Sequence, residues 1–218
     1  MSQYDFISKE QFTSKDEILK IEKELIENYC INCNGKEFYF AEIEPYYYNS
    51  NSKDLKGKWN ENTYPRECQA GDIFYHLSGM DICFNSKLPK DFKGKEDCYG
   101  GGILIRSIVE FDEKIDNKDN EKSNGIVTVG PLTCANKMLN ACEGKSMPKL
   151  SRISKKRNHT PNPQEIFRYL GEKDFKLIKE GKNIDGDLKL AFYDSEINKN
   201  SWDKARSSYY DKRIMREK

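Results

Sequence analysis

The sequence predicts a single α+β domain, built around a curved antiparallel β-sheet with helices beside it and a helical C-terminal extension. The chain has 218 residues, a length that encloses one sizeable core. Two aromatic and β-branched segments meet at Ser78-Gly79, which is typical of antiparallel strands joined by a two-residue turn. Helical patterns flank this strand-rich middle of the chain, as in the α+β class.

The expected elements follow in order along the chain. Ser14 and Glu17 have the spacing of a capping box and predict a helix to about Tyr29. A strand over 37–43 should end at Pro45, which would place Glu44 at a strand terminus before a polar loop at 47–70. Further strands are expected at 73–77, 80–84, 100–109 and 125–129, and further helices at 131–142 and 165–170. We expect residues 1–174 to form the domain and residues 175–218 to form the basic extension, helical from Ser201 to Arg216.

The composition is that of an ordered protein with a very polar surface. Hydrophobic residues make up 36% of the chain and charged residues 33%. No uncharged apolar run approaches the length of a membrane span, and the first residues lack the pattern of a secretion signal. We therefore expect a monomer in the cytoplasm, nucleoid or nucleus, with no membrane partner. The net charge is +1, but basic residues exceed acidic ones after residue 150, which is typical of a surface that contacts phosphates.

The cysteines favour a reducing compartment. There are seven, an odd number, and several lie inside apolar segments where a reduced cysteine acts as a small hydrophobe. A zinc site would need Cys30-Ile-Asn-Cys33 together with Cys68 and Cys98, but the last two do not form a paired C-x-x-C motif. We expect no metal.

Carboxylates are the residues best placed for chemistry. The Gly100-Gly-Gly102 segment leads into a strand and not into a helix, so it is no phosphate-binding loop and we expect no cofactor. The two histidines, His76 and His159, give Cys-His or Ser-His schemes little material.

Four segments together resemble a known enzyme family. They are Ala41-Glu-Ile-Glu-Pro-Tyr46, residues 71–85, Gly102-Ile-Leu-Ile-Arg106 and Gly130-Pro131. In this order and at these intervals they resemble the alkyladenine (3-methyladenine) DNA glycosylase family, whose pattern runs E-x-E-A-Y, then Y-G-M-x-x-C-x-N, then V-L-L-R, then G-P. Leu150-Ser-Arg-Ile153 and Phe167-Arg-Tyr-Leu-Gly171 resemble the closing segments of that family.

The resemblance implies a DNA glycosylase, a hydrolase that flips a nucleotide out of DNA and cleaves its N-glycosidic bond, as in base excision during DNA repair. It implies that Glu44 is the general base that deprotonates a water attacking C1′ of the sugar. It implies that Arg106 orients Glu44 and this water, and that the main-chain carbonyl of Ile153 is a further water contact. We expect a monofunctional mechanism, although Lys56 and Lys58 leave a lyase open.

The resemblance also implies how DNA, including single-stranded or modified DNA, would be held. Tyr46 and Tyr75 would hold the flipped base between their rings, and Asn85 would line the pocket. Residues expected to contact the nucleic acid are Ser78, Arg66, Lys155, Lys156 and Arg157.

The chain departs from the family at positions that bear on the substrate. The family wedges a tyrosine into the duplex directly before Gly-Met, where this chain has Ser78, and no histidine follows Glu44 before residue 76. Pro45 replaces the usual alanine, and Leu132-Thr133 follows Gly130-Pro131 where a basic residue is usual. These departures favour an unpaired, modified or weakly stacked base, or a free nucleoside, since such bases cost less to extrude.

Structural roles are the alternatives. Arg106 could pair with Glu42, Asp81 or Glu110 across the sheet. Both tyrosines could be core aromatics, Asn85 a turn residue and His76 a sheet histidine; the basic residues could be solvated surface charge. The rival for the whole protein is a non-catalytic nucleic-acid or nucleotide binding protein on the same fold, and a plainer one is an interaction module whose C-terminal helix docks a protein.

Overall fold

The computed structural model describes residues 4–52, 65–90, 97–110, 126–154, 163–168 and 189–194. Two helices are present in these ranges, α1 (Lys15–Asn28) and α2 (Pro131–Ala141). The strands are β1 (Tyr29–Cys33), β2 (Lys36–Asn49), β3 (Ile73–His76), β4 (Gly79–Cys83), β5 (Tyr99–Glu110), β6 (Ile126–Val129), β7 (Lys149–Arg152), β8 (Pro163–Arg168) and β9 (Lys189–Asp194).

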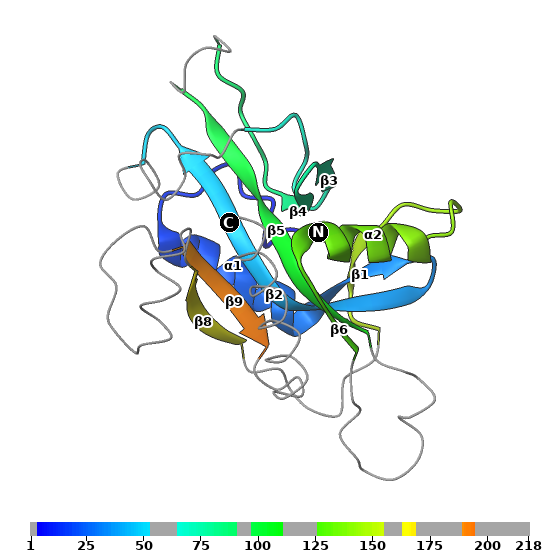
Figure 1. Cartoon of the computed structure of the whole chain (residues 1–218). Helices are drawn as coiled ribbons and strands as arrows, with labels where there is room; N and C mark the ends of the chain where they lie inside the picture. The colour runs from blue at the N-terminus through cyan, green and yellow to red at the C-terminus, as the bar shows by residue number, and fades with distance from the viewer. Residues whose placement is uncertain are drawn as a thin grey trace, which may run out of the picture.

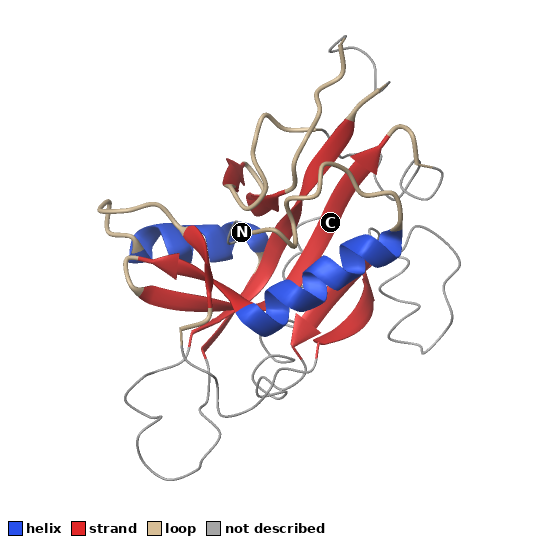
Figure 2. Cartoon of the chain, turned by 180° about the vertical axis from the view of Figure 1, so that it is seen from behind, coloured by secondary structure: helices blue, strands red, loops and turns tan. Residues whose placement is uncertain are grey.

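All strand pairs are antiparallel, and they form one curled sheet (Figure 1). The order β3-β4-β5-β2-β1-β7 runs across it, while β6 pairs with β5, and β9 pairs with both β2 and β8. The two helices pack against the strands (Figure 2). The prediction of an α+β domain with a curved antiparallel sheet is therefore confirmed.

The two faces of the central strands differ in chemistry. Apolar residues from both helices join alternate strand residues in one core, which includes Leu25, Met138, Met80, Ile82 and Ile105. We call the side of the strands that carries Met80 and Ile82 the core face. The opposite side carries buried polar residues, Glu42, Glu44, Asp81 and Arg106, and we call it the polar face.

The strand β2 is longer than expected, because it continues through Pro45 to Asn49. The predictions that Pro45 ends the strand, and that a loop begins at residue 47, were wrong. Pro45 pairs with Ile103 of β5, whereas β9 pairs with β2 only at Glu42 and Ile43. Among the described strands, Pro45 itself therefore has a neighbour on one side only, and a proline is tolerated at such an edge-like position.

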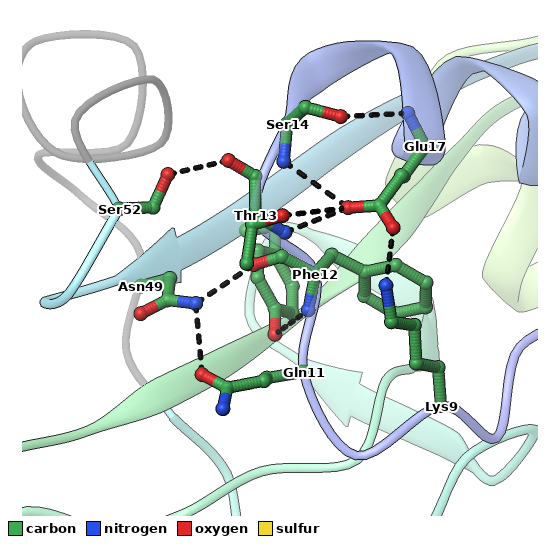
Figure 3. A network of polar contacts seen from close by, with 9 residues as sticks. Lys9, Gln11, Phe12, Thr13, Ser14, Glu17, Asn49 and Ser52 are labelled. Atoms are coloured by element: carbon green, nitrogen blue, oxygen red, sulfur yellow. Dashed lines mark hydrogen bonds and ion pairs between the residues drawn. The ribbon is translucent and has the colours of Figure 1, made fainter.

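A network of hydrogen bonds ties the end of β2 to the chain before α1 (Figure 3). The Asn49 amide donates to the Phe12 carbonyl at 2.7 Å, and the Ser52 hydroxyl donates to the Thr13 carbonyl at 2.6 Å. Ser14 and Glu17 form the predicted capping box at the start of α1. This network therefore links the end of β2 to the segment that leads into α1.

The helix predicted at 165–170 is wrong. Residues Pro163–Arg168 form β8, which pairs with β9 along its whole length. A neighbouring strand satisfies the main-chain groups of so short a segment, and this tertiary pairing overrides the local pattern. Part of the expected helical extension is also a strand, since β9 pairs with β2 at Glu42 and Ile43. The helix expected from Ser201 to Arg216 lies outside the described residues.

Candidate functional site

Glu44 and Arg106 form a buried ion pair at the middle of the polar face. Arg106 Nη1 donates to Glu44 Oε2 at 2.5 Å, and the two residues are only 1% and 7% exposed, respectively. Glu44 lies on β2 and Arg106 on β5, where Leu104 is the direct cross-strand partner of Glu44. Two of the three residues that the sequence singled out for catalysis, Glu44 and Arg106, are thus in contact.

A second carboxylate, that of Glu42, lies at the same place, next to two irregularities in the β2·β5 pairing. The register shifts between Phe40 and Glu42, and again between Glu42 and Ile43. Glu42 and Glu44 are two residues apart on β2, and both carboxylates approach Arg106. Glu42 Oε1 lies 3.8 Å from Arg106 Nε, and Glu42 Oε2 accepts a hydrogen bond from the Ser107 hydroxyl at 3.2 Å.

Arg106 therefore lies close to two carboxylates, Glu44 as the candidate catalytic partner and Glu42 as a structural partner. Of the structural partners expected from the sequence, Glu42 is near Arg106, whereas Asp81 pairs with Arg66 and Glu110 with Lys36 and Lys137. Burial opposes the charge of Arg106, but the carboxylates of Glu44 and Glu42 outweigh it and raise the pKa of Arg106. The guanidinium is thus a fixed cation between two carboxylates.

Tyr46 completes this group from the next outward position on β2. Burial raises the pKa of the Tyr46 phenol, and the negative charge of Glu44 raises it further. The phenol is hydrogen-bonded to Glu44, and it also feels the charges of Arg106 and Asp81. Because the phenol keeps its proton, it can only donate to the carboxylate. Tyr46 therefore positions Glu44 in addition to any contact that its ring makes with a base.

A second cluster of charged and aromatic side chains lies on the same face, at the β3 edge of the sheet. Asp81 of β4 is 1% exposed, and its Oδ2 lies 2.5 Å from Arg66 Nη1. Its Oδ1 lies 3.0 Å from His76 Nε2, while His76 Nδ1 accepts from the Ser78 N–H at 3.2 Å. The Arg66 guanidinium stacks 4.8 Å from the centre of the Phe74 ring.

The sequence interpretation missed Asp81 and Phe74. The signal was present in the hairpin register, because Phe74 pairs with Asp81, and Asp81 pairs with Leu104, the partner of Glu44. Direct cross-strand partners share a face, so counting outward from the Ser78-Gly79 turn places Phe74 and Asp81 on one face, and the pairing of β4 with β5 brings that face beside Glu44.

Tyr75 lies on the other side of the sheet. It pairs with Met80 and packs against the apolar core. Burial there raises the pKa of its phenol, and the nearby thiols of Cys142 and Cys33 raise it further. Tyr46 lies on the polar face, so the expected clamp of Tyr46 and Tyr75 around one base is wrong. Successive strand residues point to opposite faces, and this strand offers Phe74 and His76 to the polar face instead.

Asn85 is engaged by the main chain. Its amide nitrogen donates to the Ser8 carbonyl at 2.6 Å, and its amide oxygen accepts from the Ala70 N–H at 3.0 Å. Both polar atoms hold separate segments together just after β4. This is the structural alternative, and the structure does not bring Asn85 to the Glu44–Arg106 pair.

The remaining expected contacts lie elsewhere or outside the described residues. Ser78 is exposed at the tip of the β3–β4 hairpin, beside Leu77, which is 98% exposed. Ile153 follows β7, where its N–H donates to the Asn28 carbonyl at 3.0 Å and its side chain packs near Tyr39 and Ala41. Lys155, Lys156 and Arg157 lie outside the described residues.

Nothing in the described ranges gathers three or more side chains that would hold a metal ion. Seven free cysteines are present, and burial raises the pKa of Cys33, Cys83 and Cys134. Neither of two surface cavities borders Glu44: Glu67, Cys68 and Asp72 help to line one, and Phe12, Lys20 and Glu24 the other. In the same part of the chain, no helix has the length and apolar character to cross a membrane.

Comparisons with family models, with curated proteins and with solved structures find no match to this chain. The resemblance to the alkyladenine DNA glycosylases therefore stays a prediction from short motifs. The function must be argued from the polar face itself.

Proposed function

We propose that the protein is an N-glycosidic bond hydrolase that acts on a flipped, modified or unpaired nucleotide of DNA, with Glu44 as the base that activates water. The observation that supports it most is the buried Glu44–Arg106 pair, at 2.5 Å, with Tyr46 hydrogen-bonded to the same carboxylate. A carboxylate held by two donors has a fixed direction, as a general base requires.

The chemistry matches the charges of the polar face. In the proposed step the C1′–N bond breaks and the base leaves with the bonding electrons, while a water oxygen attacks C1′ and gives a proton to Glu44. The sugar passes through an oxocarbenium-like state with a positive charge, which nearby carboxylates stabilise. Glu44 and Glu42 lie together around Arg106, and Asp81 lies on the same face. Arg106 keeps Glu44 oriented, since its guanidinium already contacts the carboxylate.

The substrate proposed is a base that leaves its stack easily. Ser78 is at the tip of the hairpin and has only a hydroxymethyl group, which is too small to fill the gap left by a flipped nucleotide. Single-stranded DNA and damaged or mismatched bases cost the least to extrude.

The test is base release from single-stranded and double-stranded DNA with alkylated, deaminated or hydroxymethylated bases, and from nucleosides, measured by mass spectrometry. Glu44→Gln keeps the size of the side chain but cannot accept a proton, so we expect binding to persist and base release to fall at least about a hundredfold. Glu10→Gln, on an exposed surface, is the matched control and should release bases as the wild type does. Normal base release by Glu44→Gln would refute the mechanism.

One observation favours the rival, a non-catalytic nucleic-acid or nucleotide binding protein. Glu44 is only 1% exposed, so neither a water nor a sugar reaches it without movement of the side chains around it. If the wild type binds one of the substrates but releases no base from any of them, this rival replaces the hydrolase.

A further inference from the structure

Four of the seven free cysteines form two thiol–thiol contacts. Cys33 is hydrogen-bonded to Cys142, and Cys83 is hydrogen-bonded to Cys68. The C-x-x-C spacing of Cys30 and Cys33 does not produce either contact, because Cys33 packs in the main apolar core and Cys30 in a separate cluster. The fold, and not a local motif, therefore decides which thiols meet.

The chain holds the Cys68–Cys83 contact in place on both sides. Arg66, two residues before Cys68, lies 2.5 Å from Asp81, two residues before Cys83. After Cys68 the chain turns and is bonded to β4, since the Cys83 N–H donates to the Asp72 carbonyl at 2.8 Å. The segment that carries Cys68 therefore runs beside β4, and the two thiols need little movement to form a bond.

The two thiols of this pair differ in their access to solvent. Cys83 is 0% exposed, whereas Cys68 is half-buried and lines a surface cavity of about 490 Å³, a size typical of small-molecule sites. Burial raises the pKa of the Cys83 thiol, and its hydrogen bond with Cys68 raises it further. A reagent from solvent therefore meets Cys68 first, with Cys83 directly behind it.

The other pair is closed to solvent. Cys33 and Cys142 are 0% and 2% exposed and belong to the apolar core, and neither of the two cavities described above borders them. Burial raises the pKa of the Cys33 thiol, so it stays protonated and unreactive. This pair has the same thiol contact without the access, which makes it an internal control.

The cavity beside Cys68 has an acidic lining. Its described lining residues include two carboxylates, Glu67 and Asp72, and no basic side chain. A cleft lined by one sign of charge concentrates molecules of the opposite sign. A small molecule that enters this cavity and reaches Cys68 is therefore favoured when it carries a positive charge.

We propose that Cys68 and Cys83 are a redox-active pair, which a small, positively charged disulfide oxidises reversibly to an intramolecular disulfide. In the first step the Cys68 sulfur attacks one sulfur of the small disulfide. An S–S bond forms between them, the S–S bond of the small molecule breaks, and the leaving thiolate takes up the proton of Cys68. In the second step the Cys83 sulfur attacks the Cys68 sulfur, and the second small thiolate leaves with the proton of Cys83. Two protein thiols are thus oxidised, and one small disulfide is reduced to two thiols.

The oxidised pair would join two parts of the polar face. Arg66 lies two residues before Cys68, and Asp81 two residues before Cys83, so the new bond would fix the segment that carries Arg66 covalently to β4. The proposal does not depend on the proposed hydrolase, because it concerns thiols that take no part in that reaction.

The test treats the full chain with cystamine, a disulfide with two positive charges, and with dithiodipropionate, a disulfide of similar size with two negative charges. Free thiols are then alkylated, and peptide mass spectrometry locates every disulfide. We expect the wild type to lose two of its seven thiols, to join Cys68 to Cys83, and to recover both thiols in a reductant. Cystamine should react at least about threefold faster than dithiodipropionate at low salt, and salt should reduce this difference.

Three variants separate the roles of the thiols. Cys83→Ser removes the second thiol, so the reaction should stop with one small thiol bound to Cys68. Cys68→Ser leaves only the buried Cys83, so the rate should fall at least about tenfold. Cys142→Ser is the matched control, because it removes the closed pair and should leave the reaction at Cys68 unchanged.

Three results would overturn the proposal: no loss of thiols in the wild type, a small thiol that stays on Cys68 in the wild type as it does in Cys83→Ser, or oxidation of Cys33 and Cys142 at the same rate. Equal rates with the two small disulfides would overturn the assignment of a positively charged oxidant.

Discussion

Arg106 Nη1 lies 2.5 Å from Glu44 Oε2, and the strands that carry the two residues are direct neighbours in the sheet. Both side chains are almost completely withdrawn from water, and Glu42 approaches the same guanidinium at 3.8 Å. Removing one partner from such a group leaves a buried charge without compensation, which is costly whatever the group does in function.

The first prediction concerns the stability of this pair. We expect Arg106→Met to lower the free energy of unfolding by about 3–5 kcal/mol, because Glu44 and Glu42 then stay buried without their cation. The double variant Glu44→Gln with Arg106→Met should lose at least about 1 kcal/mol less than the sum of the single losses. Urea denaturation of the four proteins gives the coupling. Lys145→Met, at an exposed ion pair, should change stability little, and additive losses at Glu44 and Arg106 would contradict the contact.

The second prediction uses two tyrosines on opposite faces. Tyr46→Phe removes a hydrogen bond to Glu44 and should slow base release by about ten- to hundredfold. Tyr75→Phe removes a buried hydroxyl that has no hydrogen-bond partner among the described residues, so it should leave base release unchanged and should not lower the free energy of unfolding. Initial rates and urea denaturation of the two variants check both statements. Equal effects on base release would mean that the assignment of faces is wrong.

Much of the fold could be predicted from local signals. The capping box at Ser14, the turn at Ser78-Gly79 and the proline at residue 131 each start or end an element where expected. The errors occur where long-range pairing decides. Pro45 continues a strand because, among the described strands, it pairs with β5 alone, and residues 163–168 are a strand because β9 lies beside them. Which strands lie beside Pro45 and beside residues 163–168 is not visible in the local sequence around either segment.

The site was predictable as far as chain order determines it. Glu44 and Arg106 could be chosen from their motifs, and they lie in contact. Tyr75 was misplaced because only the hairpin register fixes its face. Arg66 was expected to contact nucleic acid, with solvated surface charge as the alternative, and its ion pair with Asp81 and the space at Gly102 depend on the pairing of β4 with β5. The register within the β3–β4 hairpin can be counted from its turn, but a single sequence does not show which distant strands pair with each other.

The third prediction is a pH dependence of stability at the start of α1. The hydrogen bond from Lys9 lowers the pKa of Glu17 from its usual value to about 2, and main-chain and hydroxyl donors of Thr13 contribute. A carboxyl whose pKa is depressed by folding stabilises the protein above its unfolded pKa, near 4.5, and this stability disappears as the pH falls toward 2. Glu17→Gln should therefore cost about 1 kcal/mol at pH 7 and progressively less below pH 4.5. Unfolding free energies at several pH values check this, and a cost independent of pH would contradict it.

The fourth prediction concerns the contact between the β3–β4 hairpin and α2. Gly79 has φ +151°, and a Cβ atom there would lie 2.7 Å from Pro131 Cβ and 3.0 Å from its main-chain carbon. Since the main chain at the start of α2 cannot yield as a flexible side chain does, Gly79→Ala should lower the free energy of unfolding by about 2–3 kcal/mol.

The matched control for this substitution is Gly35→Ala, at φ +88° with nothing within 4 Å of the added atom, so that it carries backbone strain alone. Hydrogen exchange should also become faster in β3 and at the start of α2 when Gly79 is replaced, and not when Gly35 is replaced. Equal losses of stability in the two variants would mean that the hairpin does not depend on its contact with Pro131. A larger loss at Gly79 would show that the start of α2 holds the strands carrying Phe74, His76 and Asp81 in place beside Glu44.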